Sequence, residues 1–103
     1  MQASIVAESE NLVFRISGTL VFEDNKEWRT LAEEMLQTEA KNYILDVTGL
    51  EMVDSAGLGM MLAMKQWAEK QSRSLKLRYN DSSVVGGMFR LARFDAMFEV
   101  DKK

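Results

Sequence analysis

The chain has 103 residues, 47% of them hydrophobic and 28% charged, and a net charge of −3, a composition typical of one small globular domain. It contains no cysteine and no histidine, which excludes a disulfide framework and argues against a zinc site or histidine-based catalysis. The sequence has no basic stripe of the kind that binds nucleic acid. No apolar run approaches the roughly 20 residues that cross a bilayer, and the N-terminus does not resemble a secretory signal. We therefore expect a cytoplasmic domain over residues 1–103 that uses no cofactor.

The first part of the chain is predicted to form a β-hairpin and a helix. Residues 3–7 form a short strand, and residues 12–17 alternate in the period of a half-buried strand, which Gly18 ends. Either Asp24 or Asn25 can cap the helix that follows. The apolar residues of this helix recur at the spacing of one helix face: Trp28, Leu31, Ala32, Met35 and Leu36.

The second part of the chain alternates strands and helices. The apolar run at 43–47 predicts a central strand buried on both faces, in which Asp46 is hydrated or hydrogen-bonded. Further elements are expected at 54–71 (helix), 75–79 (strand), 83–94 (helix) and 97–100 (edge strand). The last of these helices is expected to bury Val84, Val85, Met88, Leu91 and Ala92. The order ββαβαβα(β) predicts an α/β fold, with a mixed four- to five-stranded sheet packed with three main helices.

Residues 54–59, which open the second helix, are the most informative segment, and two interpretations of them remain open. In the first, Ser55 caps the helix, Asp54 complements the helix dipole, and Gly57 and Gly59 allow tight packing on the sheet. In the second, Ser55 is exposed and can be phosphorylated, because a helix N-terminus favours an anion. The phosphate, with a charge of about −2, would then act on whatever binds that surface.

The first turns of the same helix are apolar in nearly every direction, through Leu58, Met60, Met61, Leu62, Ala63 and Met64. A helix on a sheet needs only one apolar stripe, so some apolar surface is expected to stay uncovered, and methionine suits adaptable contacts. Met61 and Met64 are expected in the core. Met60 is either a core residue or a docking contact beside Ser55.

Residues 43–59 resemble the STAS domains of bacterial anti-sigma factor antagonists. The likeness centres on the Asp-Ser-x-Gly-Leu-Gly core at 54–59, includes the strand that ends in Ser17-Gly18-Thr19-Leu20, and covers nearly the whole chain. It implies a partner-switching regulator of transcription or signal transduction. A serine kinase that is also an anti-sigma-like protein would phosphorylate Ser55, and a metal-dependent phosphatase of the PP2C type would reverse this. The unphosphorylated form would bind the kinase, which then releases its other client.

The resemblance also implies that the chain is a substrate and binding module rather than an enzyme, and a monomer when free. The composition adds the expectation that neither nucleic acid nor membrane is a partner. The implied partner surface consists of Asp54, Ser55, Ala56, Gly57, Leu58, Gly59, Met60, Val21, Glu23 and Asp24. Family members often carry an acidic residue soon after the second strand, where this chain has Val21 and then Phe22. The final client therefore need not be a sigma factor.

An alternative function is that of a constitutive STAS scaffold subunit of a transport or signalling complex, in which Ser55 only caps its helix. Two further groups of residues are given structural roles. Gly86 and Gly87 are expected to let the third helix pack tightly on the sheet. A solvated basic face is expected at Lys65, Lys70, Arg73, Lys76 and Arg78.

Overall fold

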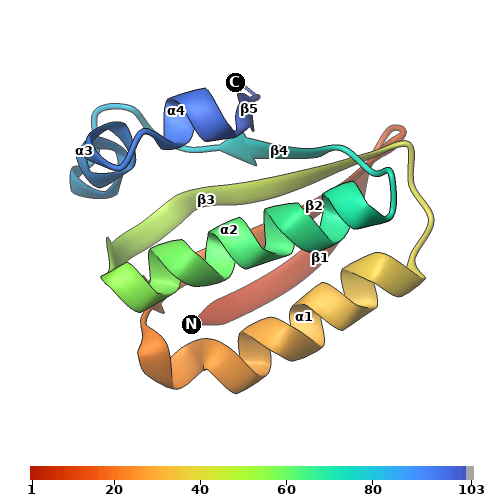
Figure 1. The fold of residues 1–103 in the computed structure, drawn as a ribbon, viewed down its shortest axis with the longest axis horizontal. Coiled ribbons are helices and arrows are strands. Elements are labelled where there is room, and N and C mark those ends of the chain that lie inside the picture. Colours follow the sequence, from red (N-terminus) through yellow and green to blue (C-terminus); the bar gives the residue numbers. More distant parts are fainter. Residues whose placement is uncertain (102–103) are drawn as a thin grey trace.

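The computed structural model describes residues 1–101, apart from the side chain of Leu36, and shows a twisted sheet with two long helices across one face (Figure 1). The elements in chain order are β1 (Gln2–Glu8), β2 (Asn11–Leu20), the 3₁₀ helix η1 (Phe22–Asp24), α1 (Asn25–Gln37), β3 (Asn42–Val53), α2 (Ser55–Lys70), β4 (Leu75–Arg78), α3 (Val84–Leu91), α4 (Phe94–Met97) and β5 (Glu99–Val100). The predicted α/β fold with a mixed sheet is confirmed, and η1 and α4 are additional short helices.

The sheet has the strand order β1-β2-β3-β4-β5. β1 and β2 form an antiparallel hairpin, whereas every later pair of neighbours is parallel. Parallel neighbours need a crossover, so α1 connects β2 to β3 and α2 connects β3 to β4, and the two helices run side by side (Figure 1). The carboxyl ends of β2 and β3 lie together, and both helices begin there.

The core lies between the sheet and the helices. Along β3, Tyr43, Leu45 and Val47 belong to this core, whereas Ile44 and Asp46, which are also buried, point to the opposite face because successive strand residues alternate. The prediction that 43–47 form a strand buried on both faces is therefore confirmed, although β3 continues to Val53 through residues expected to form a connection. None of the helices within residues 1–101 has the length and apolar character needed to cross a bilayer.

The second strand does not end at Gly18, as the sequence predicts, but continues to Leu20. Gly18 has a φ of +82°, and the pairing with β3 shifts register between Gly18 and Thr19. The glycine thus produces a bulge rather than an end, because only glycine adopts this backbone conformation without strain.

The third helix differs from its prediction in length and in the face that it buries. α3 ends at Leu91, since Arg93 adopts a left-handed φ of 63°, and α4 follows as a separate turn. Val84 and Leu91, expected in the core, are 79% and 87% exposed. The side of α3 that is buried carries Val85, Gly86 and Phe89. The reason lies in two contacts from outside α3: a Cβ at Gly86 would collide with the Asn80 carbonyl oxygen, and the Phe89 ring stacks on Phe94 at 5.3 Å.

Candidate functional site

Ser55 is the first residue of α2, and its side chain is exposed. The N-cap of α2 is Asp54, whose Oδ1 accepts a hydrogen bond from the Gly57 amide at 2.7 Å. Within residues 1–101, the Ser55 hydroxyl takes no hydrogen bond. The interpretation in which Ser55 caps the helix is therefore wrong, because the carboxylate of the preceding residue does this and leaves the hydroxyl available.

The second carboxylate oxygen of Asp54 is also used. Oδ2 accepts a hydrogen bond from the Phe22 amide at 3.2 Å, and the Asp54 amide donates to the Leu20 carbonyl oxygen at 3.3 Å. Asp54 therefore joins the end of β2, η1 and the first turn of α2. Its carboxylate also lies at the positive end of the α2 dipole, as predicted.

The two glycines of α2 have different surroundings. A Cβ at Gly57 would collide with the Leu20 carbonyl oxygen and lie 2.6 Å from Cγ2 of Val53, so the packing of α2 on the sheet requires glycine there. A Cβ at Gly59 would meet no atom within 4 Å. Glycine inside a helix costs about 0.8–1 kcal/mol relative to alanine, and the packing of the chain itself does not explain this cost at Gly59.

A groove of about 290 Å³ runs between α1 and α2 and begins next to Ser55. Phe22, which is 66% exposed, stands at the η1 end of the groove, and Trp67 lines it farther along α2. Between them, the α2 side is lined by Ala56, Gly59, Met60 and Ala63. Met60 is only 9% exposed and belongs to the core, although it also lines the groove. The Met60 carbonyl oxygen accepts a hydrogen bond from Trp28 Nε1 at 2.8 Å, which ties α1 to α2.

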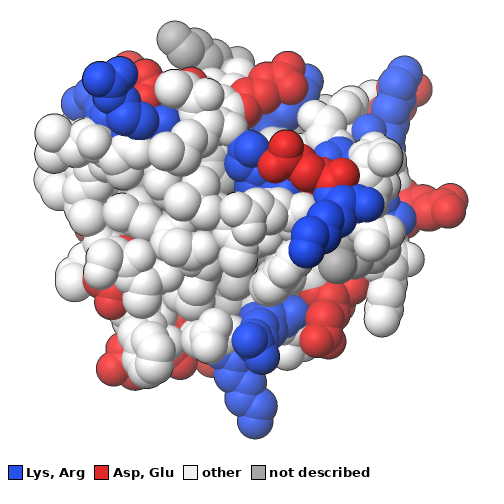
Figure 2. All heavy atoms as spheres, viewed as in Figure 1, with Lys and Arg blue, Asp and Glu red and all other residues white. Residues whose placement is uncertain are grey.

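The α2 side of this groove carries no charge, whereas Arg29 lies on the α1 side. Residues 55–64 of α2 include no Asp, Glu, Lys or Arg. Figure 2 shows the same view as Figure 1, with a broad uncharged area on its left half, over the N-terminal part of α2, and charged side chains around its borders. Leu58, Leu62 and Ala63 in this part of α2 are only half-buried, so some apolar surface stays uncovered near Ser55, as predicted.

The structure brings the predicted partner-surface residues to one end of the sheet, but it exposes only some of them. Ser55, Gly59 and Glu23 are exposed, whereas Gly57 and Met60 are buried. The other members of the set are half-buried, namely Val21, Asp24, Asp54, Ala56 and Leu58. Phe22 was not among the predicted surface residues, although a large aromatic residue between Val21 and two acidic residues was the available signal.

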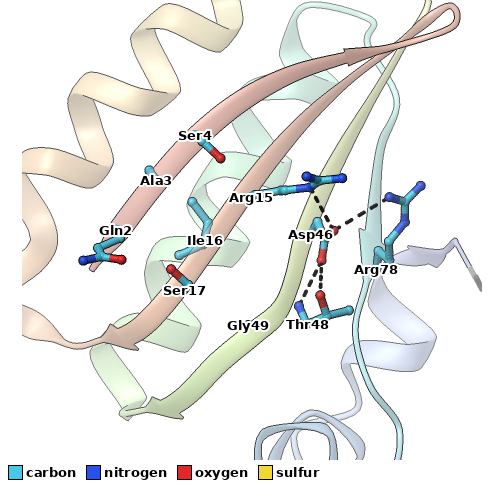
Figure 3. Close-up of a pocket in the computed structure, with 10 residues that line it drawn as sticks. All are labelled: Gln2, Ala3, Ser4, Arg15, Ile16, Ser17, Asp46, Thr48, Gly49 and Arg78. Carbon is cyan, nitrogen blue, oxygen red and sulfur yellow. Dashed lines mark hydrogen bonds and ion pairs between the residues drawn. The ribbon is translucent and has the colours of Figure 1, made fainter.

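A second hollow, of about 560 Å³, lies on the opposite, helix-free face of the sheet (Figure 3). Asp46 stands at its centre: Oδ1 accepts hydrogen bonds from the amide and hydroxyl of Thr48, at 3.0 and 2.7 Å. Its Oδ2 lies 3.8 Å from Arg15 Nε and 3.8 Å from Arg78 Nη1. The expectation that Asp46 is hydrogen-bonded is confirmed, and the residues come from β2, β3 and β4 (Figure 3).

The prediction that Arg78 belongs to a solvated basic face is wrong, because Arg78 is only 4% exposed and lies in an ion-pair network. Its Nη2 lies 3.2 Å from Glu8 and 2.7 Å from Asp101. Burial lowers the pKa of Arg78, but the hydrogen bonds to Glu8 and Asp101 outweigh this desolvation and raise the pKa above its ordinary value. Three acidic neighbours surround this cation: Glu8 on β1, Asp46 on β3 and Asp101 directly after β5. The network therefore fixes strand positions rather than forming an anion site.

Arg73, from the same predicted face, is half-buried, lies 5.4 Å from the centre of the Tyr43 ring and donates to the Met35 carbonyl oxygen. It covers core residues rather than facing only solvent. Within residues 1–101, the acidic side chains form no group of three or more that could hold a metal ion.

A family model described as "Mlab, STAS domain" matches residues 3–99 of the chain. The chain is also 24% identical over 94 residues to a STAS-domain containing protein of Pseudomonas aeruginosa, and the match covers 91% of each protein. The sequence-based resemblance to STAS domains is therefore confirmed.

Solved structures share the fold at lower sequence identity. The anti-sigma factor antagonist SpoIIAA in its unphosphorylated form has a TM-score of 0.64 and 21% identity, over 87% of this chain and 83% of that one. The phosphorylated form of SpoIIAA from Bacillus has a TM-score of 0.70 and 18% identity, over 99% and 91% of the two chains. A sulfate transporter family protein from Wolinella succinogenes has a TM-score of 0.68 and 17% identity, over 89% and 75%.

Proposed function

The chain belongs to the STAS domain family, and from that premise we propose that it is a phosphorylation-controlled partner-switching regulator. The unphosphorylated form binds a serine-kinase partner that resembles an anti-sigma factor, and phosphorylation of Ser55 ends this binding. One observation carries the proposal: Asp54 caps α2, so that Ser55 stands exposed at the helix N-terminus with a hydroxyl that no other contact within residues 1–101 uses. The similarity to SpoIIAA, which is known in unphosphorylated and phosphorylated forms, supports the same assignment.

The proposed switch acts on the surface and leaves the fold intact. A phosphate on Ser55 leaves both hydrogen bonds of the Asp54 carboxylate in place, and the N-terminus of α2 favours an anion. The added charge of about −2 stands beside the α2 side of the groove, which carries no charged residue. A partner that covers this surface would have to remove water from the phosphate dianion, which is costly unless the partner supplies matching cations.

The remaining parts of the proposal rest on the resemblance to anti-sigma factor antagonists and on the composition of the chain. A PP2C-type phosphatase restores the unphosphorylated form, and the kinase holds a second client that it releases when it binds this chain. Residues 1–103 act as one domain, free in the cytoplasm as a monomer, and bind neither nucleic acid nor membrane. The chain itself performs no catalysis, because Ser55 serves as the acceptor in the partner's reaction.

A second candidate function is a constitutive STAS scaffold in a transport or signalling complex. The similarity to a sulfate transporter family protein favours it. In that case Ser55 carries no phosphate under any growth condition, and partner binding does not depend on the charge at this position.

Intact and tandem mass spectrometry of the protein purified from its own cells separates the two functions. The proposed switch requires a single phosphate that maps to Ser55, is absent in Ser55→Ala, and persists in the control Ser82→Ala, which alters another exposed serine. If no phosphate is found in any growth phase or stress condition, the switch is wrong and the scaffold function replaces it.

A further inference from the structure

We propose that the partner docks through an amphipathic helix, which lies in the groove between α1 and α2 and packs against Phe22. This inference rests on the proposed function, and it names the structural element of the partner that the surface beside Ser55 accepts. Three features of the groove carry it: a fixed exposed aromatic residue, a glycine that the fold does not need, and a polar rim along one side.

Phe22 is exposed, but the backbone that carries it is held in place. Its side chain is 66% exposed, yet its amide donates to Asp54 Oδ2 at 3.2 Å. The neighbouring Val21 amide donates to Asp24 Oδ2 at 2.9 Å, and the Asp24 amide donates back to the Val21 carbonyl oxygen at 2.9 Å. A large apolar side chain on a backbone that is already ordered loses little freedom on binding, which is the property of an interface anchor.

On its α2 side, the groove is lined by small residues. Ala56, Gly59 and Ala63 follow one another at spacings of three and four, so they share the side of α2 that faces α1. From Ala56 to Trp67 the groove extends along α2 for about 16 Å, the length of three helical turns. At Gly59 an added side chain would meet no atom within 4 Å, so the backbone of α2 is open to a close approach from outside.

The rim of the groove indicates an amphipathic occupant. On the α1 side, the groove is lined by Asn25 and, four residues later, Arg29. A second hollow, which shares Arg29 and Trp67 with the groove, is lined by Glu33 after a further four residues. An occupant therefore meets an apolar floor and polar groups along one edge. A helix satisfies its own backbone hydrogen bonds, whereas an extended segment would leave its amides facing side chains of α1 and α2 instead of the edge of a sheet.

The position of Ser55 makes this groove responsive to phosphorylation. Ser55 precedes Ala56, the first α2 residue of the groove, and the Phe22 amide is bound to the carboxylate of Asp54, directly before Ser55. A phosphate on Ser55 stands at the mouth of the groove, where the end of a docked helix would exclude water from it.

In-cell photo-crosslinking tests the inference and captures the partner in the same step. Benzoylphenylalanine is placed at Phe22 or Ala63 in the groove, and at Ser4 on the helix-free sheet face and Val84 on α3 as exposed controls. We expect adducts from the groove positions only, and peptide mapping should locate the crosslinked site in an amphipathic helical segment of the partner. Adducts that arise only from the control positions, that map to an extended segment, or that do not form at all would overturn the inference.

Once crosslinking has identified the partner, its affinity for variants of this chain at two glycines can be compared. Gly59→Ala should raise the melting temperature of the chain yet weaken binding at least tenfold, and Phe22→Ala should weaken it at least as much. The control Gly87→Ala, on the exposed part of α3, should leave the affinity unchanged, because a Cβ there meets only the end of Arg90 at 3.6 Å. Equal affinity of Gly59→Ala and wild type would refute the close approach at this residue.

The same partner separates this inference from the proposed function. If Ser55→Asp binds as tightly as wild type while the groove adducts persist, the phospho-switch is wrong and the docking mode stands. If Ser55 is phosphorylated in cells but the groove positions give no adduct, the switch stands and the docking mode is wrong.

Discussion

Alanine substitutions at Gly57 and Gly59, two residues apart on the same helix, should change stability in opposite directions. Both changes remove a helical glycine and by themselves should stabilise the chain by about 0.8–1 kcal/mol. At Gly59 nothing opposes this gain, since a Cβ would meet no atom within 4 Å. At Gly57 a Cβ collides with the backbone of Leu20, which cannot move aside as a flexible side chain would.

The magnitude at Gly57 follows from what must shift. Relief of the collision moves the first turn of α2 away from β2, and overpacking of this kind typically costs about 1–3 kcal/mol. The same movement lengthens the hydrogen bond between Asp54 and the Gly57 amide, and a lost N-cap costs about 0.5–2 kcal/mol. After the propensity gain is subtracted, Gly57→Ala should destabilise by about 2 kcal/mol, whereas Gly59→Ala should stabilise by about 1 kcal/mol.

Urea titration followed by tryptophan fluorescence measures both changes in free energy, and thermal unfolding followed by far-ultraviolet circular dichroism measures the melting temperatures. At about 4–8 °C per kcal/mol for a domain of this size, the melting temperature should fall by about 10 °C for Gly57→Ala and rise by about 5 °C for Gly59→Ala. If both variants were stabilised, or both destabilised, the assignment of Gly57 to close packing and of Gly59 to an open surface would be refuted.

Three further predictions concern the charged and capping residues. Asp54→Ala should lower the free energy of unfolding by about 1–2 kcal/mol, whereas Asp54→Ser should keep a cap for α2 and mainly accelerate hydrogen exchange at the Phe22 amide, as NMR would show. Arg78→Leu leaves the acidic neighbours without their cation and should lower the free energy of unfolding by about 3–5 kcal/mol, as measured by urea titration. The control Arg15→Leu, at a half-exposed arginine, should lower it by less than about 1 kcal/mol. Equal losses would contradict the buried network. For Ser55→Asp, the free energy of unfolding should lie within about 0.5 kcal/mol of the wild-type value. Calorimetric titration should show that this variant loses affinity for the kinase partner, while Ser55→Ala keeps it.

Local periodicity predicted most of the fold, because its strongest signals coincide with real burial. The run at 43–47 is the buried first half of β3, and the stripe that includes Trp28 and Met35 is buried on α1. Periodicity failed on α3, whose residues are apolar on more than one side. Contacts with Asn80 and Phe94, which lie outside this helix, decide which of these sides faces the core.

The parts of the site that the sequence did not predict depend on partners far along the chain. Arg78 resembles a solvated residue in an alternating strand, yet its acidic partners Glu8 and Asp101 lie 70 and 23 residues away. Phe22 is presented beside Ser55 because Asp54, 32 residues later, binds its amide. No window of sequence short enough to show a period contains both members of such a pair.

The division of roles between Asp54 and Ser55 explains how one modification could change binding without unfolding the chain. If Ser55 capped α2, phosphorylation would replace the bond that starts the helix, and stability and affinity would change together. Because Asp54 provides the cap and also holds Phe22, a phosphate on Ser55 meets a helix start and a groove wall that are already fixed. The free energy of the added charge is then expressed at the surface that the partner must cover, so the switch should appear as a change in affinity at nearly constant stability.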